Sequence, residues 1–295
     1  MHPSITLLAL VATPISALHL NLWPRAGSCP AVWSEVASEL ETTFAGCGKD
    51  AHGAIRAVFH DCITSGCDGS LILSDECTTR TENAGLSDIC SELDNWRKKY
   101  SVGAADMIQF AAAMAISSCP LGPRVQALVG RIDSSVPSAT GGVPGSRDSV
   151  EKILGAFSAK GFSPEDVVAL MGTHSVALQF FDDPSQAGQS LDSTPSRLDI
   201  RFYNETKFGT APYSLQSDRL LANATETRNT WDVYAESTTT WSEAFTSAWN
   251  RFAVVGSDPQ NLQDCSDLIP QSSVRRRRLE ANEAFVEKLR KKFIA

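Results

Sequence analysis

The sequence lacks long apolar runs, an excess of positive charge and clear strand patterns. No stretch of about 18 consecutive apolar residues occurs in its 295 residues, so we expect no segment to span a membrane. The net charge is −8, which argues against binding to nucleic acid, because such binding needs Lys and Arg to neutralise phosphates. Alternation of apolar and polar residues is scarce and no internal repeat is found. The chain is therefore expected to be all-α.

Charged side chains are also missing from residues 1–17, which contain no Asp, Glu, Lys or Arg. An apolar stretch followed by small residues is typical of a signal peptide, here cleaved after Ala17; a buried or unstructured N-terminus is the alternative. The eight cysteines agree with export, because disulfides persist in oxidising compartments. Two Asn-X-Thr triplets, at Asn204 and Asn223, are candidate glycosylation sites. We therefore expect a secreted, extracellular protein.

The C-terminal end carries the opposite charge from the rest of the chain. Residues 275–295 hold eight Lys and Arg against three Glu, whereas residues 18–274 are acidic. We interpret residues 271–295 as a solvated basic tail. Binding to an anionic surface is the alternative.

Helical spacing of apolar residues predicts three helices. They cover Val32 to Phe44, residues 104–116 and residues 163–181. In the last, Ser163 caps the start, Pro164 suits the first turn and Asp166 completes a capping box.

A segment rich in Gly, Pro and Ser, residues 133–149 (the junction segment), divides the chain. We place the boundary near residue 150, between a first half of residues 18–150 and a second of residues 151–270. In the second half, His174 falls on the same helix face as three apolar residues. A histidine in that position is often a core residue, so the spacing alone does not make it a ligand.

Arg56 and His60 form the most informative pair. They are four positions apart, so on a helix they point to one place. Cleavage of a peroxide O–O bond needs such a pair: an imidazole moves the proton, and a guanidinium stabilises the negative charge that develops. The nearby cation also favours the neutral imidazole that a base must be. The alternative is a surface Arg–His pair.

Each of the two histidines precedes residues that suit calcium. After His60, the loop offers carboxylates, a hydroxyl and carbonyls at Asp61, Gly66, Asp68 and Ser70. After His174, the same chemistry occurs at Ser175, Asp192, Thr194, Arg197 and Asp199. Cys62 and Cys67 flank the first loop, which could otherwise be an Asx-rich turn. We expect each ion to fix the end of a histidine-bearing helix.

Six motifs together resemble the plant, fungal and bacterial haem peroxidase superfamily, most closely the secreted fungal class II group. They are AIRAVFHDC, GCDGS, ENAGL, VVALMGTHSVA, LDSTPSRLD and LQSD. The resemblance covers roughly residues 29–270 and keeps the motifs in order. It implies a two-domain helical fold with haem b between a distal and a proximal half, two calcium ions and a monomeric enzyme.

Carried over by motif, the resemblance assigns a role to seven positions. It implies a distal acid–base histidine, a distal arginine and a packing phenylalanine at His60, Arg56 and Phe59. It implies that Asn83 orients His60, that His174 is the proximal iron ligand and that Asp218 accepts the other N–H of His174. It places Pro144 near an opening at the haem edge.

The resemblance also implies how the cysteines pair. The class II pattern gives Cys29–Cys265 and Cys47–Cys119, and a short bridge known from secreted plant peroxidases gives Cys62–Cys67. Cys77 and Cys90 are left and are paired with each other.

This chain departs from the family pattern at several positions, and these departures narrow its expected function. Manganese-oxidising members have carboxylates where this chain has Lys49, Gly53 and Phe180. Lignin and versatile peroxidases have an exposed tryptophan where this chain has Ala169. The family's glutamate six residues before Asn83 is Cys77 here, so Glu76 or Glu82 is left to replace it, unless the network differs. The basic tail has no family counterpart.

We therefore expect reduction of hydrogen peroxide coupled to one-electron oxidation of small phenolic donors at the haem edge. One alternative is a non-catalytic haem- or calcium-binding protein, for which His174 and a pocket would suffice and the Arg56, His60 and Asn83 set would have no use. The other is direct oxidation of Mn²⁺.

Overall fold

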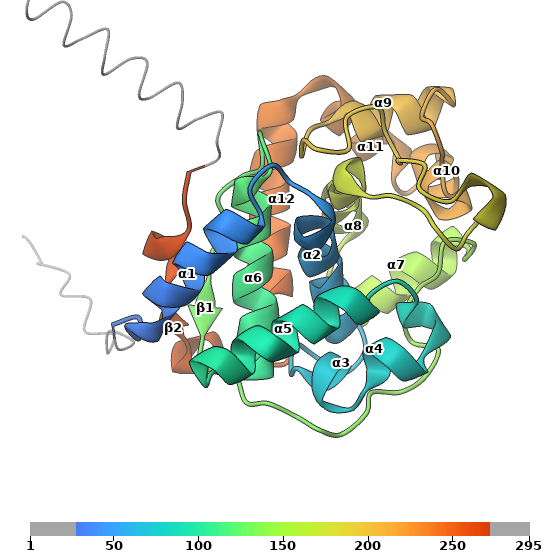
Figure 1. Ribbon diagram of the computed structural model, residues 1–295. Coiled ribbons are helices and arrows are strands. Elements are labelled where there is room, and N and C mark those ends of the chain that lie inside the picture. The colour runs from blue at the N-terminus through green and yellow to red at the C-terminus, as the bar shows by residue number, and fades with distance from the viewer. Residues whose placement is uncertain (1–27, 272–295) are drawn as a thin grey trace, which may run out of the picture.

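A computed structural model describes residues 28–271, which form an almost entirely helical protein (Figure 1). The predicted signal peptide and the basic tail from residue 272 lie outside the described residues. The α-helices are α1 (Val32–Thr43), α2 (Lys49–Cys62), α3 (Ser70–Leu73), α4 (Glu76–Thr79), α5 (Ser87–Tyr100), α6 (Ala104–Ser118), α7 (Val150–Ser158), α8 (Pro164–Met171), α9 (Arg201–Phe208), α10 (Gln216–Asn223), α11 (Arg228–Glu236) and α12 (Thr238–Phe252). Short 3₁₀ turns are η1 (Thr81–Asn83), η2 (Gly172–Val176), η3 (Pro184–Gln186), η4 (Pro259–Asn261) and η5 (Ser266–Leu268), and the only strands in residues 28–271 are β1 (Leu128–Val129) and β2 (Gln263–Asp264), which pair antiparallel. The expected all-α class is confirmed.

Helix α6 forms the centre of the molecule, with α1, α2 and α5 packed against it (Figure 1). All of its residues except Ser118 are buried. The helix is rich in alanine, whose small side chains let neighbouring helices approach closely. The core helix expected over 104–116 is therefore confirmed, and it fixes the position of α2, which carries Arg56 and His60.

Helix α8 is shorter than expected. Its start has the predicted capping box, in which the Ser163 hydroxyl accepts from Asp166 N and the Asp166 carboxylate accepts from Ser163 N. The predicted continuation to residue 181 is wrong, because the α-helix ends at Met171 and tightens into η2. His174 therefore lies on a 3₁₀ turn.

Two buried aromatic donors explain this early end. Tyr203 Oη donates to the carbonyl of Val168 at 2.7 Å, and Trp241 Nε1 donates to that of Ala169 at 3.1 Å. The last carbonyls of a helix need such partners. The Trp241 ring also fills the space beside Gly172, where a Cβ would lie 2.4 Å from Nε1. Tertiary packing thus sets where η2, and with it His174, begins.

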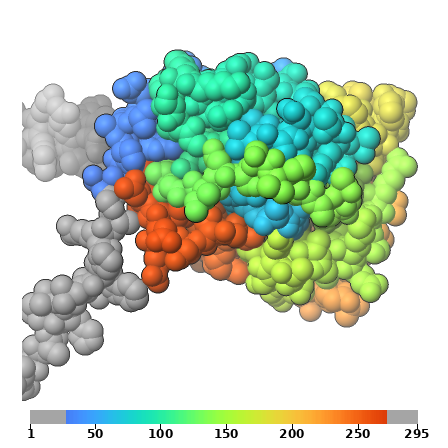
Figure 2. Space-filling model, turned by 90° about the horizontal axis from the view of Figure 1, so that it is seen from below, coloured from blue at the N-terminus to red at the C-terminus, as the bar shows by residue number. Residues whose placement is uncertain are grey.

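The junction segment runs as an exposed strip between the two halves of the chain. In Figure 2 the green residues cross one face, between the cyan region of the first half and the orange C-terminal region. Its first residue, Asp133, accepts from the backbone N–H groups of Ala104 and Ala105 and so caps α6. The division into two domains near residue 150 stays a prediction.

Four disulfides join the cysteines as expected: Cys29–Cys265, Cys47–Cys119, Cys62–Cys67 and Cys77–Cys90. Cys77–Cys90 ties α4 to α5, and Cys62–Cys67 closes the loop after His60. Among residues 28–271, no helix is long and apolar enough to cross a membrane.

The contact between Gly172 and Trp241 generates a stability prediction. Gly172→Ala should destabilise the protein by about 1–3 kcal/mol, because the added methyl overlaps a buried indole. Gly155→Ala in α7 is the matched control: nothing lies within 4 Å of the new Cβ, and alanine is favoured over glycine in a helix by roughly 0.5–1 kcal/mol. Urea unfolding of both variants measures the difference, and equal midpoints would contradict the packing argument.

Candidate active site

His60 lies in the last turn of α2 and is held by Asn83 from η1. Asn83 Oδ1 lies 2.7 Å from His60 Nδ1, and since an amide oxygen only accepts, Nδ1 must carry the proton. The Asn83 amide nitrogen donates in turn to the carbonyl of Glu76 at 2.9 Å, which fixes the orientation of the amide. In the neutral form of His60, Nε2 is therefore the nitrogen with a free lone pair.

Arg56 lies one turn before His60 on α2, and the same loop holds it. Its Nη1 donates to the carbonyl of Ala84 at 2.9 Å. The side chain is exposed, yet enough protein surrounds it that burial lowers the pKa of the guanidinium to about 10. At neutral pH the guanidinium is therefore still charged.

The surroundings of His60 keep it neutral. Burial first, and the charge of Arg56 second, lower the pKa of His60 to about 3, against the opposing effect of the bond to Asn83. Phe59 is half-buried between His60, at 5.3 Å between ring centroids, and Phe157 of α7, stacked at 5.8 Å. Phe59 thus packs the first half of the chain against the second beside His60.

His174 in η2 has a carboxylate partner. Its Nδ1 lies 3.1 Å from Oδ2 of Asp218, which is fully buried on α10 and also accepts from the Ser217 hydroxyl. The edge of the ring packs against Phe202 of α9 at 5.6 Å. As at His60, the bond at Nδ1 leaves Nε2 as the free nitrogen.

The two histidines belong to elements that contact each other, α2 and η2. In the described part of the chain, neither Nε2 atom has a hydrogen bond and neither is among the buried polar atoms without a partner. Both are therefore accessible. The structure offers two oriented imidazoles with free nitrogens, one of them beside a guanidinium.

The loop after His60 folds around Asp61 through backbone hydrogen bonds. Both Asp61 oxygens accept backbone N–H groups, from Gly69 at 3.1 Å and Leu71 at 3.3 Å, and Asp68 accepts from Ser70 N at 3.0 Å. Burial raises the pKa of Asp61 to about 7, and the neighbouring carboxylates add to this. Gly66 has φ +132°, a value that favours glycine.

The segment after His174 brings its five predicted residues together. The Ser175 hydroxyl donates to the carbonyl of Arg197 at 2.8 Å and accepts from Asp199 N at 3.1 Å. Thr194 Oγ1 contacts the carboxylates of both Asp192 and Asp199. One oxygen of Asp192 is buried without any partner, and burial raises the pKa of this residue to about 6. Such an arrangement suits a cation.

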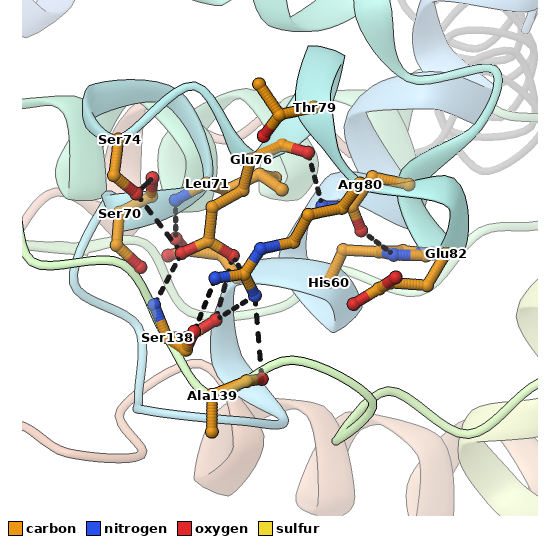
Figure 3. A network of polar contacts seen from close by, with 12 residues as sticks. His60, Ser70, Leu71, Ser74, Glu76, Thr79, Arg80, Glu82, Ser138 and Ala139 are labelled. Atoms are coloured by element: carbon orange, nitrogen blue, oxygen red, sulfur yellow. Dashed lines mark hydrogen bonds and ion pairs between the residues drawn. The ribbon is translucent and has the colours of Figure 1, made fainter.

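Glu76, rather than Glu82, replaces the expected glutamate. It is buried, and its carboxylate lies among Ser74, Ser138 and Arg80 (Figure 3). Sequence reasoning missed Arg80 altogether, although its spacing of four residues from Glu76 is typical of an ion pair.

The residues after η2 reach the loop that holds Arg56. Phe180 and Phe181 are 49% and 60% exposed. A Cβ built on Gly85 would lie 2.6 Å from Phe181 Cε2 and 3.5 Å from Arg56 Nη1, so ring and guanidinium meet at this glycine. From the sequence, Phe180 was considered only because it stands where manganese-oxidising members have a carboxylate, and Phe181 was not identified.

The junction segment contacts Asp182, the residue that directly follows Phe181. This carboxylate accepts from Ser146 Oγ at 2.6 Å, and also from Arg147 and Tyr213. Pro144 is half-buried and lies two residues before Ser146, and its role beside an opening stays a prediction. We call Phe180, Phe181, Arg56 and the Ser146 end of the junction segment the rim.

Comparison with known proteins shows which family the chain belongs to. A family model described as peroxidase matches residues 36–237. The chain is 32% identical to a peroxidase of Arthromyces ramosus, over 88% of this chain and 85% of that protein. It is 34% identical to a low-redox potential peroxidase of Taiwanofungus camphoratus (86% and 82%) and 31% identical to manganese peroxidase 2 of Phlebia radiata (84% and 73%). With these motifs and this helical fold, the chain belongs to the haem peroxidase family, among the fungal class II enzymes.

Proposed function

We propose that the protein is a secreted peroxidase that uses His60 and Arg56 to cleave hydrogen peroxide and oxidises small phenolic donors at the rim around Phe181. The observation that carries the proposal is the orientation of His60, with its proton held on Nδ1 by Asn83 and its free Nε2 beside Arg56. A non-catalytic haem carrier would have no use for this arrangement. The enzyme is expected to act as a monomer.

The residues fit a haem. The free Nε2 of His174 would hold the haem iron, and the carboxylate of Asp218 on Nδ1 would give the imidazole more anionic character. Phe59 and Phe202 supply apolar surface beside the two imidazoles. The haem supplies the iron and the electrons for O–O cleavage.

The distal residues supply the proton transfer and the charge. His60 Nε2 takes the proton from one oxygen of the bound peroxide and returns it to the other, which leaves as water. Arg56 stabilises the negative charge on the departing oxygen. Because Ala84 holds Arg56 and Asn83 holds His60, both groups start from fixed positions.

Two calcium ions are proposed beside the histidines. Asp61, Gly66, Asp68 and Ser70 would hold one, and Ser175, Asp192, Thr194, Arg197 and Asp199 the other. Support comes from buried carboxylates with raised pKa values and from the unpartnered oxygen of Asp192.

The rim favours an aromatic donor over a metal ion. Phe180 and Phe181 present flat apolar rings, whereas Lys49 is paired with Asp88 and Gly53 has no side chain. Mn²⁺ prefers carboxylate and water oxygens, so this supports phenols as donors.

Export and glycosylation belong to the same proposal. The four disulfides are compatible with an extracellular location. Asn223, the last residue of α10, is exposed, and so is Thr225 of the same triplet. The Thr206 side chain of the Asn204 triplet is instead buried, so Asn223 is the better glycan site.

Removing the distal groups tests the chemistry. His60→Ala should slow the reaction with peroxide by about 10²–10⁴-fold while haem stays bound, and Arg56→Leu should also slow it. Stopped-flow absorbance measures the rate, and the Soret band reports the haem. Rates close to the wild type in both variants would contradict the assignment of His60 and Arg56 as the groups that cleave peroxide.

The same variants have a pH signature. Since the pKa of His60 is about 3, its imidazole is neutral above that pH, and the wild-type rate should decline only as the pH falls toward that value. Arg56⁺ disfavours the imidazolium, so Arg56→Leu raises the pKa and should move the acid limb to higher pH.

Calcium removal tests the two loops. Chelation with EGTA should lower activity before global unfolding, because Asp61 and Ser175 directly follow the two histidines, and it should lower Tm, since a bound ion stabilises only the folded state. Activity, near-UV circular dichroism and metal analysis are measured on one sample. Active, freshly purified protein without calcium would rule the loops out as calcium sites.

Donor choice is tested by a side-by-side assay. Small phenols should be oxidised and Mn²⁺ should not, at any useful rate. Phe181→Ser should raise the KM for phenol, whereas Phe208→Ser, which removes another exposed ring on α9 (71% exposed, against 60% for Phe181), should leave it unchanged. Saturable Mn²⁺ oxidation with a micromolar KM would refute the prediction.

Building a manganese site tests the same argument in reverse. Lys49→Glu, Gly53→Glu and Phe180→Asp restore the family's carboxylates, but a Cβ on Gly53 would lie 3.0 Å from Ile89 Cβ. Ile89→Ala should therefore be needed as well. We expect Mn²⁺ oxidation from the fourfold variant and less or none from the threefold one.

A further inference from the structure

Arg80 connects the distal helices to the junction segment. Its Nη1 pairs with Glu76 Oε2 at 2.9 Å and donates to Ser138 Oγ at 2.9 Å, and its Nη2 donates to the Ser138 carbonyl. Only 10% of the Arg80 side chain and 2% of the Glu76 side chain are exposed. Figure 3 shows the guanidinium lying between Glu76 and the backbone of Ser138 and Ala139.

Glu76 is held from all sides. Its Oε1 accepts from Ser138 N at 2.7 Å and from Ser74 Oγ at 3.2 Å, and its Oε2 accepts from Ser138 Oγ at 2.8 Å. The Ser138 hydroxyl therefore donates to Glu76 and accepts from Arg80. A buried carboxylate left without its cation is strongly destabilised, so the pair allows this part of the chain little freedom.

The backbone of Glu76 leads to His60. The Glu76 carbonyl accepts from Asn83 Nδ2 at 2.9 Å, and Asn83 Oδ1 accepts from His60 Nδ1 at 2.7 Å. The backbone of Arg80 lies in the same turn: its N–H donates to the Glu76 carbonyl, and its carbonyl accepts from Asn83 N. Any movement of Glu76 is thus passed through one side chain to the imidazole.

We propose that Arg80 is a positioning residue for His60. By clamping Glu76 to Ser138, it fixes the carbonyl that orients Asn83, and it makes the placement of the distal histidine depend on the junction segment. The same segment continues to Pro144 and Ser146 at the rim.

The test compares four variants in the haem-loaded full chain. Arg80→Met removes the charge and the fork of donors, Arg80→Lys keeps the charge, and Ser138→Ala removes the shared hydroxyl but keeps the ion pair. Arg97→Met is the matched control, because it breaks another ion pair of the first half, with Asp94 on α5.

Two readouts are measured. Hydrogen exchange of peptides covering residues 76–84 and 138 should be faster in Arg80→Met. The per-haem rate with peroxide should fall by about 10- to 100-fold, while the later step with phenol keeps its rate. Arg80→Lys and Ser138→Ala should lie between Arg80→Met and the wild type, and Arg97→Met should match the wild type in both readouts.

A purely structural role for Arg80 would lower stability or haem content without changing the per-haem rate, and that result overturns the proposal. Unchanged exchange over residues 76–84 also overturns it. If Arg80→Met fails to fold, Ser138→Ala carries the test. The kinetic arm rests on the proposed function: a wild type that does not react with peroxide fails that function, whereas the exchange comparison still tests the clamp.

Discussion

The hydrogen bond from His60 Nδ1 to Asn83 Oδ1 is the constraint on which the site depends. It decides which ring nitrogen carries the proton, and therefore whether Nε2 can act as a base. Burial and Arg56 hold the pKa of His60 near 3, which keeps the imidazole neutral. A neutral imidazole in the other tautomer would still carry its proton on Nε2, and it could no more accept a proton there than the imidazolium could. Much of the distal half serves this bond, since Glu76 anchors Asn83 and Arg80 anchors Glu76.

His174 also has a hydrogen bond at Nδ1, and its acceptor is stronger than that of His60. Asp218, a buried carboxylate, replaces an amide as the partner of His174 Nδ1. The difference suits the two proposed roles: a base needs a fixed tautomer, whereas an iron ligand gains from more negative charge. In both places the histidine is followed directly by a residue of an oxygen-rich loop, so backbone geometry links loop and imidazole.

Strong local patterns in the sequence predicted much of the fold. The helices over residues 32–44 and 104–116 and the capping box at Ser163 rest on spacing alone, and the structure has them. The end of α8 did not follow from spacing. Apolar residues continue past Met171, but Tyr203 and Trp241, far along the chain, take the carbonyls of Val168 and Ala169 and end the helix.

The sequence by itself determined the residue types and their order: Arg56 one turn before His60, carboxylates after each histidine, cysteines in even number, and no carboxylate at Lys49, Gly53 or Phe180. These follow from the chemistry of the side chains and from short-range helical geometry. Only the tertiary structure decided that Glu76 rather than Glu82 supports Asn83, that Arg80 joins it to Ser138, and that Phe181 meets Arg56 at Gly85. The physical reason is that these contacts join separate elements, and burial selects which of several similar side chains makes each one.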